Sequence, residues 1–220
     1  MRPRRIGIPS SQNLSHCPFV YAAHTAPRGL WRYIHGVPSQ TPLHVELCTG
    51  KGNFLLYASQ RHPDWIWVGV EIAPSPLWKA VRKKISNNCY FLWMDIRYLP
   101  TAFAPGEVTR FYLHFCDPWP KQRHAQRRIT NPPFLRRYQQ CLSTEGDLVF
   151  KTDHAGLFSY SLQNLQALGW EIHAASVDLH RSPHAATNIM TEYEERYVHQ
   201  NLPIFYVRTK PNPREPGGPH

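Results

Sequence analysis

The sequence contains few acidic residues, and long stretches have none. Its 220 residues include 15 Asp and Glu against 25 Lys and Arg, which gives a formal net charge of +10. No acidic residue precedes Glu46. Two further acid-free stretches, 72–94 and 118–144, are rich in Lys and Arg. A solvated face explains any single basic cluster, but three such stretches favour a polyanionic partner such as a nucleic acid.

The chain also lacks long apolar runs and closely spaced cysteines. No apolar run approaches the length of a membrane span, and no apolar segment of a secretory signal follows the basic N-terminus. Five widely separated cysteines without a C-x-x-C pair exclude the common zinc spacings and are typical of a reducing compartment. We therefore expect a soluble, cytoplasmic protein with no metal and no membrane segment, either a monomer or a homodimer.

Strand-like and helix-like patterns alternate from residue 43 onwards, which predicts an α/β fold with a mostly parallel sheet. Two late strand-like runs predict an antiparallel hairpin at one edge of that sheet. Expected strands are 44–48, 66–72, 90–94, 110–115 and 147–151, then 170–177 and 204–208. Expected helices are 52–61, 75–86, 132–142 and 154–168.

The two ends of the chain differ from this pattern. Residues 1–42 are rich in Pro, Ser and Arg, and we interpret them as a basic arm that lies on the domain or on its ligand. Residues 43–210 form the expected catalytic domain. The Pro/Gly-rich tail, 211–220, is predicted to be disordered.

A strand, a glycine turn and a helix start follow one another at Glu46-Leu-Cys-Thr-Gly-Lys-Gly-Asn-Phe. Gly50 and Gly52 allow a tight turn that a ligand can approach. A dinucleotide fingerprint would need a third glycine where Leu55 stands, and no P-loop can be written here. A carboxylate at Glu46 would repel a pyrophosphate. It suits a cofactor with a positive sulfonium and ammonium, which is S-adenosylmethionine.

Acidic residues also follow the next expected strands. Glu71 is placed to accept from ribose hydroxyls, and Asp95 to accept from the adenine amine. Each of these acids alone is more often a surface residue or a helix cap. Together with Glu46 and Asp117 they stand at successive strand ends, which predicts one ligand site.

Asp117-Pro-Trp-Pro is the most informative stretch, because it lies between an apolar strand and a basic cluster. An acid and an aromatic side chain beside a cationic rim suit a nucleobase carried on a nucleic acid. Trp119 either stacks on a base or packs into the core. Arg127 and Arg128 are expected to contact phosphates, whereas His124 either touches RNA or packs locally.

These motifs, with Phe150-Lys-Thr-Asp153 and Thr191-Glu-Tyr-Glu194, make the sequence resemble the bacterial single-chain tRNA (guanine-N7)-methyltransferases over roughly 28–210. The resemblance implies a Rossmann-like class I methyltransferase fold and methyl transfer to a guanine in the tRNA variable loop. It departs from the family at Cys48, where the family motif has a glycine.

The resemblance also implies roles for individual residues. The cofactor residues are Glu46, Gly50, Gly52, Glu71, Asp95 and Asp117, with Asp117 also facing the reaction. The residues around the substrate are Lys121, Asp153, Thr191, Tyr193 and Glu194. The stretch 123–128, with Arg123, His124, Arg127 and Arg128, is implied to lie on the RNA. Independently of the family, Thr191 and Glu194 have the spacing of a helix capping box.

The chemistry of guanine N7 sets what this site must do. N7 has a lone pair and no proton, so its attack on a methyl group needs no general base, and catalysis rests on alignment and electrostatics. Two alternatives remain open. One is a methyltransferase for exocyclic amines, and the other is a non-catalytic RNA-binding protein on the same fold.

Overall fold

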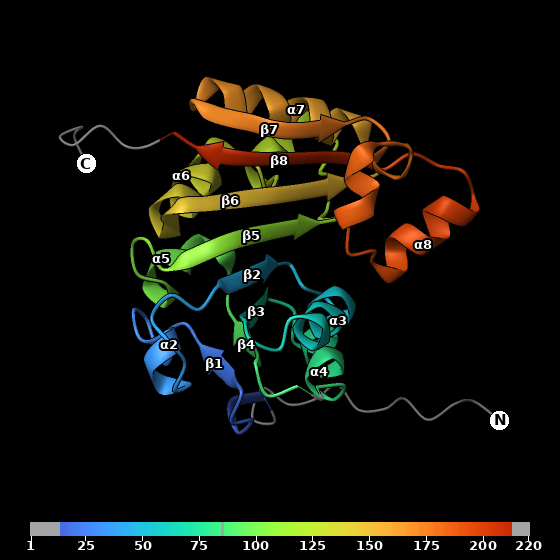
Figure 1. The fold of residues 1–220 in the computed structure, drawn as a ribbon. Coiled ribbons are helices and arrows are strands. Elements are labelled where there is room, and N and C mark those ends of the chain that lie inside the picture. The colour runs from blue at the N-terminus through green and yellow to red at the C-terminus, as the bar shows by residue number, and fades with distance from the viewer. Residues whose placement is uncertain (1–13, 85, 213–220) are drawn as a thin grey trace.

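The computed structural model describes residues 14–84 and 86–212, which build an eight-stranded sheet flanked by helices (Figure 1). The strand order is β1-β4-β3-β2-β5-β6-β8-β7, and neighbouring strands from β1 to β6 are all parallel. Only β8 runs antiparallel to its neighbours, β6 and β7. The strands are β1 (Val20–Ala22), β2 (Leu43–Leu47), β3 (Ile66–Glu71), β4 (Cys89–Trp93), β5 (Val108–His114), β6 (Leu142–Thr152), β7 (Trp170–Ser176) and β8 (Phe205–Pro211).

The predicted fold class is confirmed, and the predicted strands appear within a few residues of their expected bounds. Two details differ from the prediction. The short β1 was not predicted, because three residues are too few to display a strand period. The β7 and β8 strands are not a tight hairpin, because residues 177–204, which include helix α8 (Glu192–His199), connect them (Figure 1).

Alternating side chains divide the core into two layers. Val45 and Leu47 of β2 pack on one face, with residues of α5, α6 and α7. Trp67 of β3 and Tyr112 of β5 pack on the other face, with residues of α3 and α4. These helices are α3 (Asn53–Arg61), α4 (Pro74–Val81), α5 (Leu99–Ala102), α6 (Pro132–Cys141) and α7 (Ala155–Ala167). Because each crossover returns the chain in the same direction, the carboxyl ends of β2 to β5 meet at one edge, where α/β folds bind ligands.

The segment predicted as an arm packs on the sheet over its described part. β1 pairs with β4, and Trp31 of α2 (Trp31–Ile34) is fully buried. The packed domain therefore begins before the boundary predicted from the sequence. Residues 1–13 lie outside the described residues. At the other end Pro211 belongs to β8, and residues 213–220 of the predicted disordered tail also lie outside the described part.

Candidate active site

The connection from β2 to α3 is a tight turn formed by residues 48–52. Cys48, Gly50 and Gly52 all have left-handed backbones, with φ of 57°, 57° and 70°. The N–H of Thr49 donates to the carbonyl oxygen of Val70 at 3.0 Å, which ties the turn to β3. The turn thus keeps its conformation with a cysteine at position 48, where a glycine would adopt the same φ without strain.

The two glycines of the turn serve different purposes. A Cβ at Gly52 would lie 2.7 Å from the Cβ of Ala80, so glycine is needed for α3 and α4 to pack. A Cβ at Gly50 would meet only the carbonyl oxygen of Cys48, at 4.0 Å. Gly50 therefore presents its backbone to open space, as a ligand cradle requires.

Glu71, the last residue of β3, supports this turn. Its carboxylate accepts the N–H of Gly50 at 3.0 Å and the N–H of Ala73 at 2.8 Å. A carboxylate has about four lone-pair sites, so Glu71 can still accept from ligand hydroxyls. Its location is compatible with the predicted ribose contact.

Asp95 follows β4 and caps the short 3₁₀ helix Ile96–Tyr98. It accepts the backbone N–H of Arg97 at 2.8 Å and pairs with the Arg97 guanidinium at 2.8 Å. Partial burial alone would raise the pKa of Asp95, but the hydrogen bonds and charge of Arg97 outweigh it and lower that pKa. Asp95 is thus held as a carboxylate.

Two cavities meet at the carboxyl ends of these strands. The larger, of about 690 Å³, has Glu71, Asp95 and Trp119 in its wall. The smaller, of about 240 Å³, has Glu46 in its wall. Cys48 lines both cavities. Three of the four predicted carboxylates therefore line this pair of cavities, which share Cys48; we call the pair the cofactor cleft, after the ligand that the sequence predicts there.

Glu46 is buried in the wall of the smaller cavity. Its carboxyl accepts the hydroxyl of Thr49 and lies 3.7 Å from Nδ1 of His114. Burial raises the pKa of Glu46 to about 8, although Thr49 and Lys151 oppose the shift. Burial also lowers the pKa of His114. Both groups are therefore neutral near pH 7, whereas the sequence interpretation assumed a carboxylate at Glu46.

Asp117 lies on an exposed loop after β5. It lines neither cavity of the cofactor cleft. Within residues 14–84 and 86–212, its carboxylate has no hydrogen bond or ion pair. The structure thus places Asp117 outside the lining of both cavities, unlike the other three acids. The predicted cofactor contact of Asp117 gains no support from this position, while the exposed carboxylate is open to a substrate.

Trp119 follows on the same loop, with a left-handed backbone at φ 43°. Its half-buried ring faces the larger cavity. The guanidinium of Arg127 lies over this ring, 4.8 Å from its centroid, and His124 meets it edge-on at 5.6 Å. Trp119 therefore forms part of the wall of the cofactor cleft. The sequence had suggested instead that it stacks on a base or packs into the core.

Arg128 corrects the prediction that both neighbouring arginines contact phosphate. The residue is only 8% exposed. Its Nε donates to the carbonyl oxygen of Trp119 at 3.1 Å, and Nη2 donates to that of Pro120 at 3.3 Å. The guanidinium also lies over the ring of Tyr160, 4.4 Å from the centroid. Arg128 supports the Asp117–Pro120 loop from inside the protein instead of facing RNA.

The remaining basic residues of this stretch do reach the surface. Lys121, Arg123 and Arg127 are exposed around the 3₁₀ helix Gln122–Arg127, and His124 is half-buried. They form a basic rim beside Trp119, and Arg127 of this rim lines the larger cavity.

Glu194 is a second correction, because it was expected to contact substrate. It is fully buried, and Nζ of Lys151 lies 3.0 Å from its Oε2. It also accepts Asn188 Nδ2 at 2.9 Å and the N–H of Thr191 at 2.8 Å. Thr191 and Glu194 form the capping box that their spacing predicted. Glu194 therefore fixes α8 onto β6.

The other substrate residues predicted on α8 lie at the smaller cavity. Thr191 and Tyr193 line it, and the Tyr193 ring packs 4.6 Å from that of Phe115. Asp153 accepts the Tyr193 hydroxyl at 3.4 Å and the Tyr197 hydroxyl at 2.5 Å. The pair of tyrosines thus connects α8 to the end of β6.

Lys151 was not predicted as a site residue, although it is the cation that pairs with the buried Glu194. Burial lowers the pKa of Lys151, and the charges of Glu194 and Glu46 oppose that shift. A lysine inside the apolar run of β6 was the available signal. Arg196, which lines the smaller cavity, gave no such signal because it lies on a mostly polar helix.

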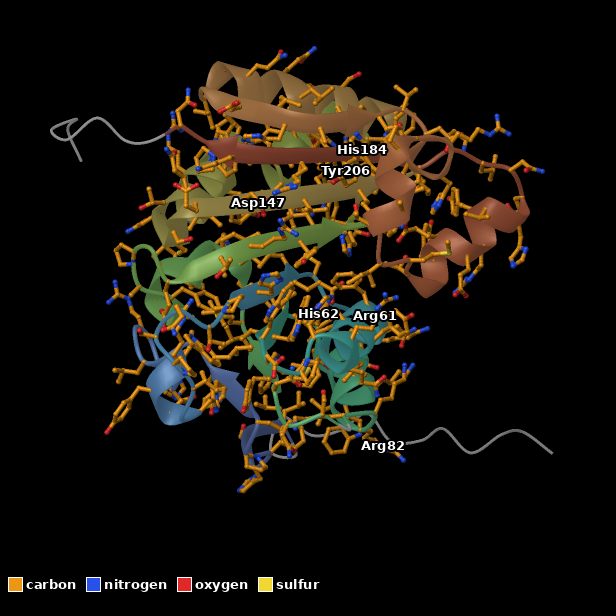
Figure 2. All side chains as sticks on the ribbon, viewed as in Figure 1. Arg61, His62, Arg82, Asp147, His184 and Tyr206 are labelled. Atoms are coloured by element: carbon orange, nitrogen blue, oxygen red, sulfur yellow. The ribbon has the colours of Figure 1, made fainter. Side chains whose placement is uncertain are left out.

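A third cavity, of about 450 Å³, lies on the α3 side of β5, β6 and β8 and shares Phe54 and His114 with the smaller cavity. Arg61 and His62 come to it from α3, and His184 and Tyr206 from the opposite side (Figure 2). Asp147 pairs with Arg110 and with Arg208, two lining arginines. None of the predicted acids lines this cavity.

Within residues 14–84 and 86–212, no group of three or more His, Cys, Asp or Glu side chains is arranged to hold a metal ion. Over the same residues, no helix is both long and apolar enough to cross a membrane.

Comparison with known proteins identifies the family. A family model described as a putative methyltransferase matches residues 40–207. The tRNA (guanine-N(7)-)-methyltransferase of Lachnoclostridium phytofermentans is 41% identical over 180 residues, which cover 80% of this chain and 83% of that protein. The chain belongs to the tRNA (guanine-N(7)-)-methyltransferase family. The Bacillus subtilis member is 40% identical over 181 residues, with 81% and 84% of the two chains covered.

Solved structures support the fold. The 16S rRNA methyltransferase KamB matches with a TM-score of 0.62 at 12% identity, over 84% of this chain and 92% of that chain. A 16S rRNA (adenine(1408)-N(1))-methyltransferase from Catenulisporales acidiphilia, solved with the cosubstrate S-adenosylmethionine, matches with a TM-score of 0.59 at 15% identity. It covers 85% of this chain and 92% of that one. The tRNA (guanine-N(7)-)-methyltransferase family thus shares the class I methyltransferase fold seen here.

Proposed function

We propose that this enzyme transfers a methyl group from S-adenosylmethionine to N7 of a guanine in the variable loop of tRNA, giving 7-methylguanosine. The observation that carries the proposal is the cofactor cleft, in which Glu46, Glu71 and Asp95 gather at the carboxyl ends of adjacent strands. Family membership supplies the reaction class.

The residues of the cleft fit S-adenosylmethionine, which supplies the methyl group when bound. Gly50 presents open backbone, and Glu71 retains acceptor capacity beside it. We assign Glu71 to the ribose hydroxyls and Asp95 to the adenine amine. Glu46 would balance the cationic end of the cofactor.

Both nitrogens of His114 support this assignment. They are buried and have no hydrogen-bond partner among the described residues. His114 lies beside Glu46, with its Nδ1 3.7 Å from the carboxyl, and lines the smaller cavity. A buried polar group without a partner indicates that a ligand or water completes the site. Neutral His114 can donate or accept a hydrogen bond there without adding charge.

The substrate side needs no proton-abstracting base. Guanine N7 carries a free lone pair, so the protein has to hold the purine in line and stabilise the positive charge that develops on it. Asp117 suits both tasks, because its exposed carboxylate can accept from N1–H and the exocyclic amine of guanine. Lys121 lies beside it and can neutralise a phosphate.

We assign Thr191, Tyr193 and Asp153 to the substrate side of the smaller cavity. Tyr193 packs on Phe115, at the start of the loop that carries Asp117. The hydroxyl of Tyr193 is held by Asp153. This arrangement makes the position of a base at Asp117 depend on the docking of α8.

Binding of tRNA is assigned to the basic rim of Lys121, Arg123, His124 and Arg127. Phosphate contacts of this kind give affinity that depends on salt and hardly on sequence. Because Arg127 also lies over Trp119, the rim connects the RNA surface with the cofactor cleft. We further expect the enzyme to act in the cytoplasm as a monomer or a homodimer.

A product assay tests the function. The enzyme is incubated with methyl-labelled S-adenosylmethionine and unmodified tRNA, and the tRNA is digested to nucleosides. We expect label in 7-methylguanosine alone. Label in a nucleoside methylated on an exocyclic amine would replace the proposal with that reaction. Absence of cofactor binding in calorimetry would favour a non-catalytic RNA-binding protein.

A further inference from the structure

Two cysteines, Cys48 and Cys116, lie near each other at the carboxyl ends of β2 and β5, beside the cofactor cleft. Cys48 is exposed in the turn after β2, and Cys116 is buried just after β5. The Sγ of Cys116 is 4.0 Å from the carbonyl oxygen of Leu47, the residue bonded to Cys48. The side-chain interaction with Cys48 is the first cause that raises the pKa of Cys116, and burial is the second.

The backbone brings these residues together. Leu47 and Leu113 are partners in the parallel pair of β2 and β5. Beyond them, Cys48 and Phe115 take left-handed conformations, with φ of 57° and 51°. These turns fold the two chain segments over the end of the sheet, so that Cys116 returns towards Cys48.

Cys48 occupies a sensitive position, because it lines both cavities of the cofactor cleft. Any covalent change at its sulfur therefore alters the junction between the cavity of Glu71 and that of Glu46. Its neighbours in the turn, Thr49 and Gly50, hold those carboxyls by hydrogen bonds.

We propose that Cys48 is a site of reversible oxidation by peroxides, that Cys116 is its resolving thiol, and that the resulting disulfide prevents cofactor binding. The effect on the cofactor rests on the proposed function, whereas the oxidation itself does not. Disulfides of intracellular proteins are usually transient and serve catalysis or redox sensing, which fits this location. An accessible cysteine next to a second thiol is the arrangement typical of redox sensors.

The chemistry balances with hydrogen peroxide as the oxidant. The Cys48 thiolate attacks one peroxide oxygen, the O–O bond breaks, and hydroxide leaves, so that Cys48 becomes a sulfenic acid. The sulfur of Cys116 then attacks the sulfenic sulfur. The S–O bond breaks, and the departing hydroxide takes the Cys116 proton and leaves as water. Both thiols are oxidised by two electrons in total, and the peroxide is reduced to two molecules of water.

The other cysteines lack this environment. Cys89 and Cys141 are buried, and burial raises the pKa of Cys89 to about 12. Cys17 is half-buried, and burial raises its pKa as well. A higher pKa lowers the thiolate fraction and hence the reactivity. Oxidation should therefore be selective for Cys48.

The experiment compares wild-type enzyme with Cys48→Gly, Cys116→Ser and the control Cys17→Ser. Glycine suits the φ of 57° at position 48, so Cys48→Gly keeps the backbone of the turn. Each protein is treated with hydrogen peroxide, digested without reduction, and searched by mass spectrometry for the cross-linked peptides of 48 and 116. Calorimetry then measures S-adenosylhomocysteine binding before oxidation, after oxidation, and after reduction with dithiothreitol.

We expect the cross-link in the wild type and in Cys17→Ser, and in neither of the other two variants. Oxidation should weaken cofactor binding of the wild type by about tenfold or more, and reduction should restore it. In Cys48→Gly, peroxide should leave the binding constant unchanged. Bound S-adenosylhomocysteine should also slow cross-linking, because it covers Cys48.

The absence of a cross-link in the oxidised wild type would overturn the proposal. A cross-link that leaves the binding constant unchanged would overturn the link to the cofactor. If the function proposed above is wrong, the result is different. The reduced enzyme will then not methylate tRNA, whether or not the cross-linked peptides of 48 and 116 are found.

Discussion

Cofactor binding should release a proton from Glu46. The ligand-free carboxyl is buried, with a pKa of about 8, and the cationic end of S-adenosylmethionine favours its ionised form. At pH 7 such a group is about 90% protonated, and ionising it costs about 1.4 kcal/mol, or a factor of about ten in affinity. Binding should therefore release about 0.9 proton at pH 7 and about 0.1 proton at pH 9 from this group.

Calorimetry in buffers of different ionisation enthalpy measures this proton. Because the amino group of the cofactor titrates as well, Glu46→Gln serves as the control with the same ligand and buffers. The difference between the wild type and the variant should fall as pH rises from 7 to 9. Equal proton release by the two proteins at pH 7 would refute the assignment of Glu46.

The same shift predicts the pH dependence of stability without cofactor. The pKa of Glu46 is raised on folding, from 4.5 to about 8. Its neutral form therefore contributes stability that is complete below about pH 4.5 and is lost as pH rises through about 8. In urea unfolding experiments, the free energy of unfolding of the wild type should fall by a few kcal/mol as pH rises across this window. A Glu46→Gln variant with the same pH dependence would contradict the reasoning.

Four further substitutions test other parts of the site. Asp117→Asn should lower the turnover number about 10²–10³-fold while calorimetry shows unchanged cofactor binding, and near-normal turnover would remove Asp117 from the reaction. Arg127→Ala should lower the slope of log affinity against log salt by about 1 in tRNA-binding assays, since one phosphate contact is lost. Arg128→Ala should leave that slope unchanged. It should instead lower the free energy of unfolding in urea by about 1–3 kcal/mol, because two carbonyl oxygens lose their hydrogen-bond donor. A changed slope with normal stability would show that Arg128, and not only Arg127, contacts phosphate. Lys151→Met should lower the free energy of unfolding in urea by about 3–5 kcal/mol, because it leaves Glu194 as a buried charge without its lysine partner. A decrease of less than about 1 kcal/mol would show that the Lys151–Glu194 pair does not hold α8 in place.

Local patterns in the sequence predicted much of the architecture. Alternating apolar runs located β2 to β6, because burial on both faces of a parallel sheet requires them. The spacing of Thr191 and Glu194 predicted the capping box, which depends only on neighbouring residues. Gly50 and Gly52 were recognised as a turn for the same reason.

The mistaken predictions concern contacts between distant segments. Arg127 and Arg128 are adjacent and chemically identical, and only the fold places Arg128 beneath the loop and Arg127 above it. The partner of Glu194 on α8 is Lys151, which lies far away in the sequence on strand β6. The strand-end position of Asp117 was also recognised from the sequence, but which cavity its side chain lines depends on the bend after β5. Such distances are tertiary and leave no local pattern.

The central claim is that the enzyme methylates N7 of guanine, and a modified substrate tests it most directly. A tRNA is prepared with 7-deazaguanosine, in which a C–H group replaces N7, at the target position of the variable loop. We predict that this tRNA binds like the unmodified one but accepts no labelled methyl group. Methylation of the 7-deazaguanosine tRNA at a normal rate would contradict it, because the acceptor atom would then have to be another atom of the RNA.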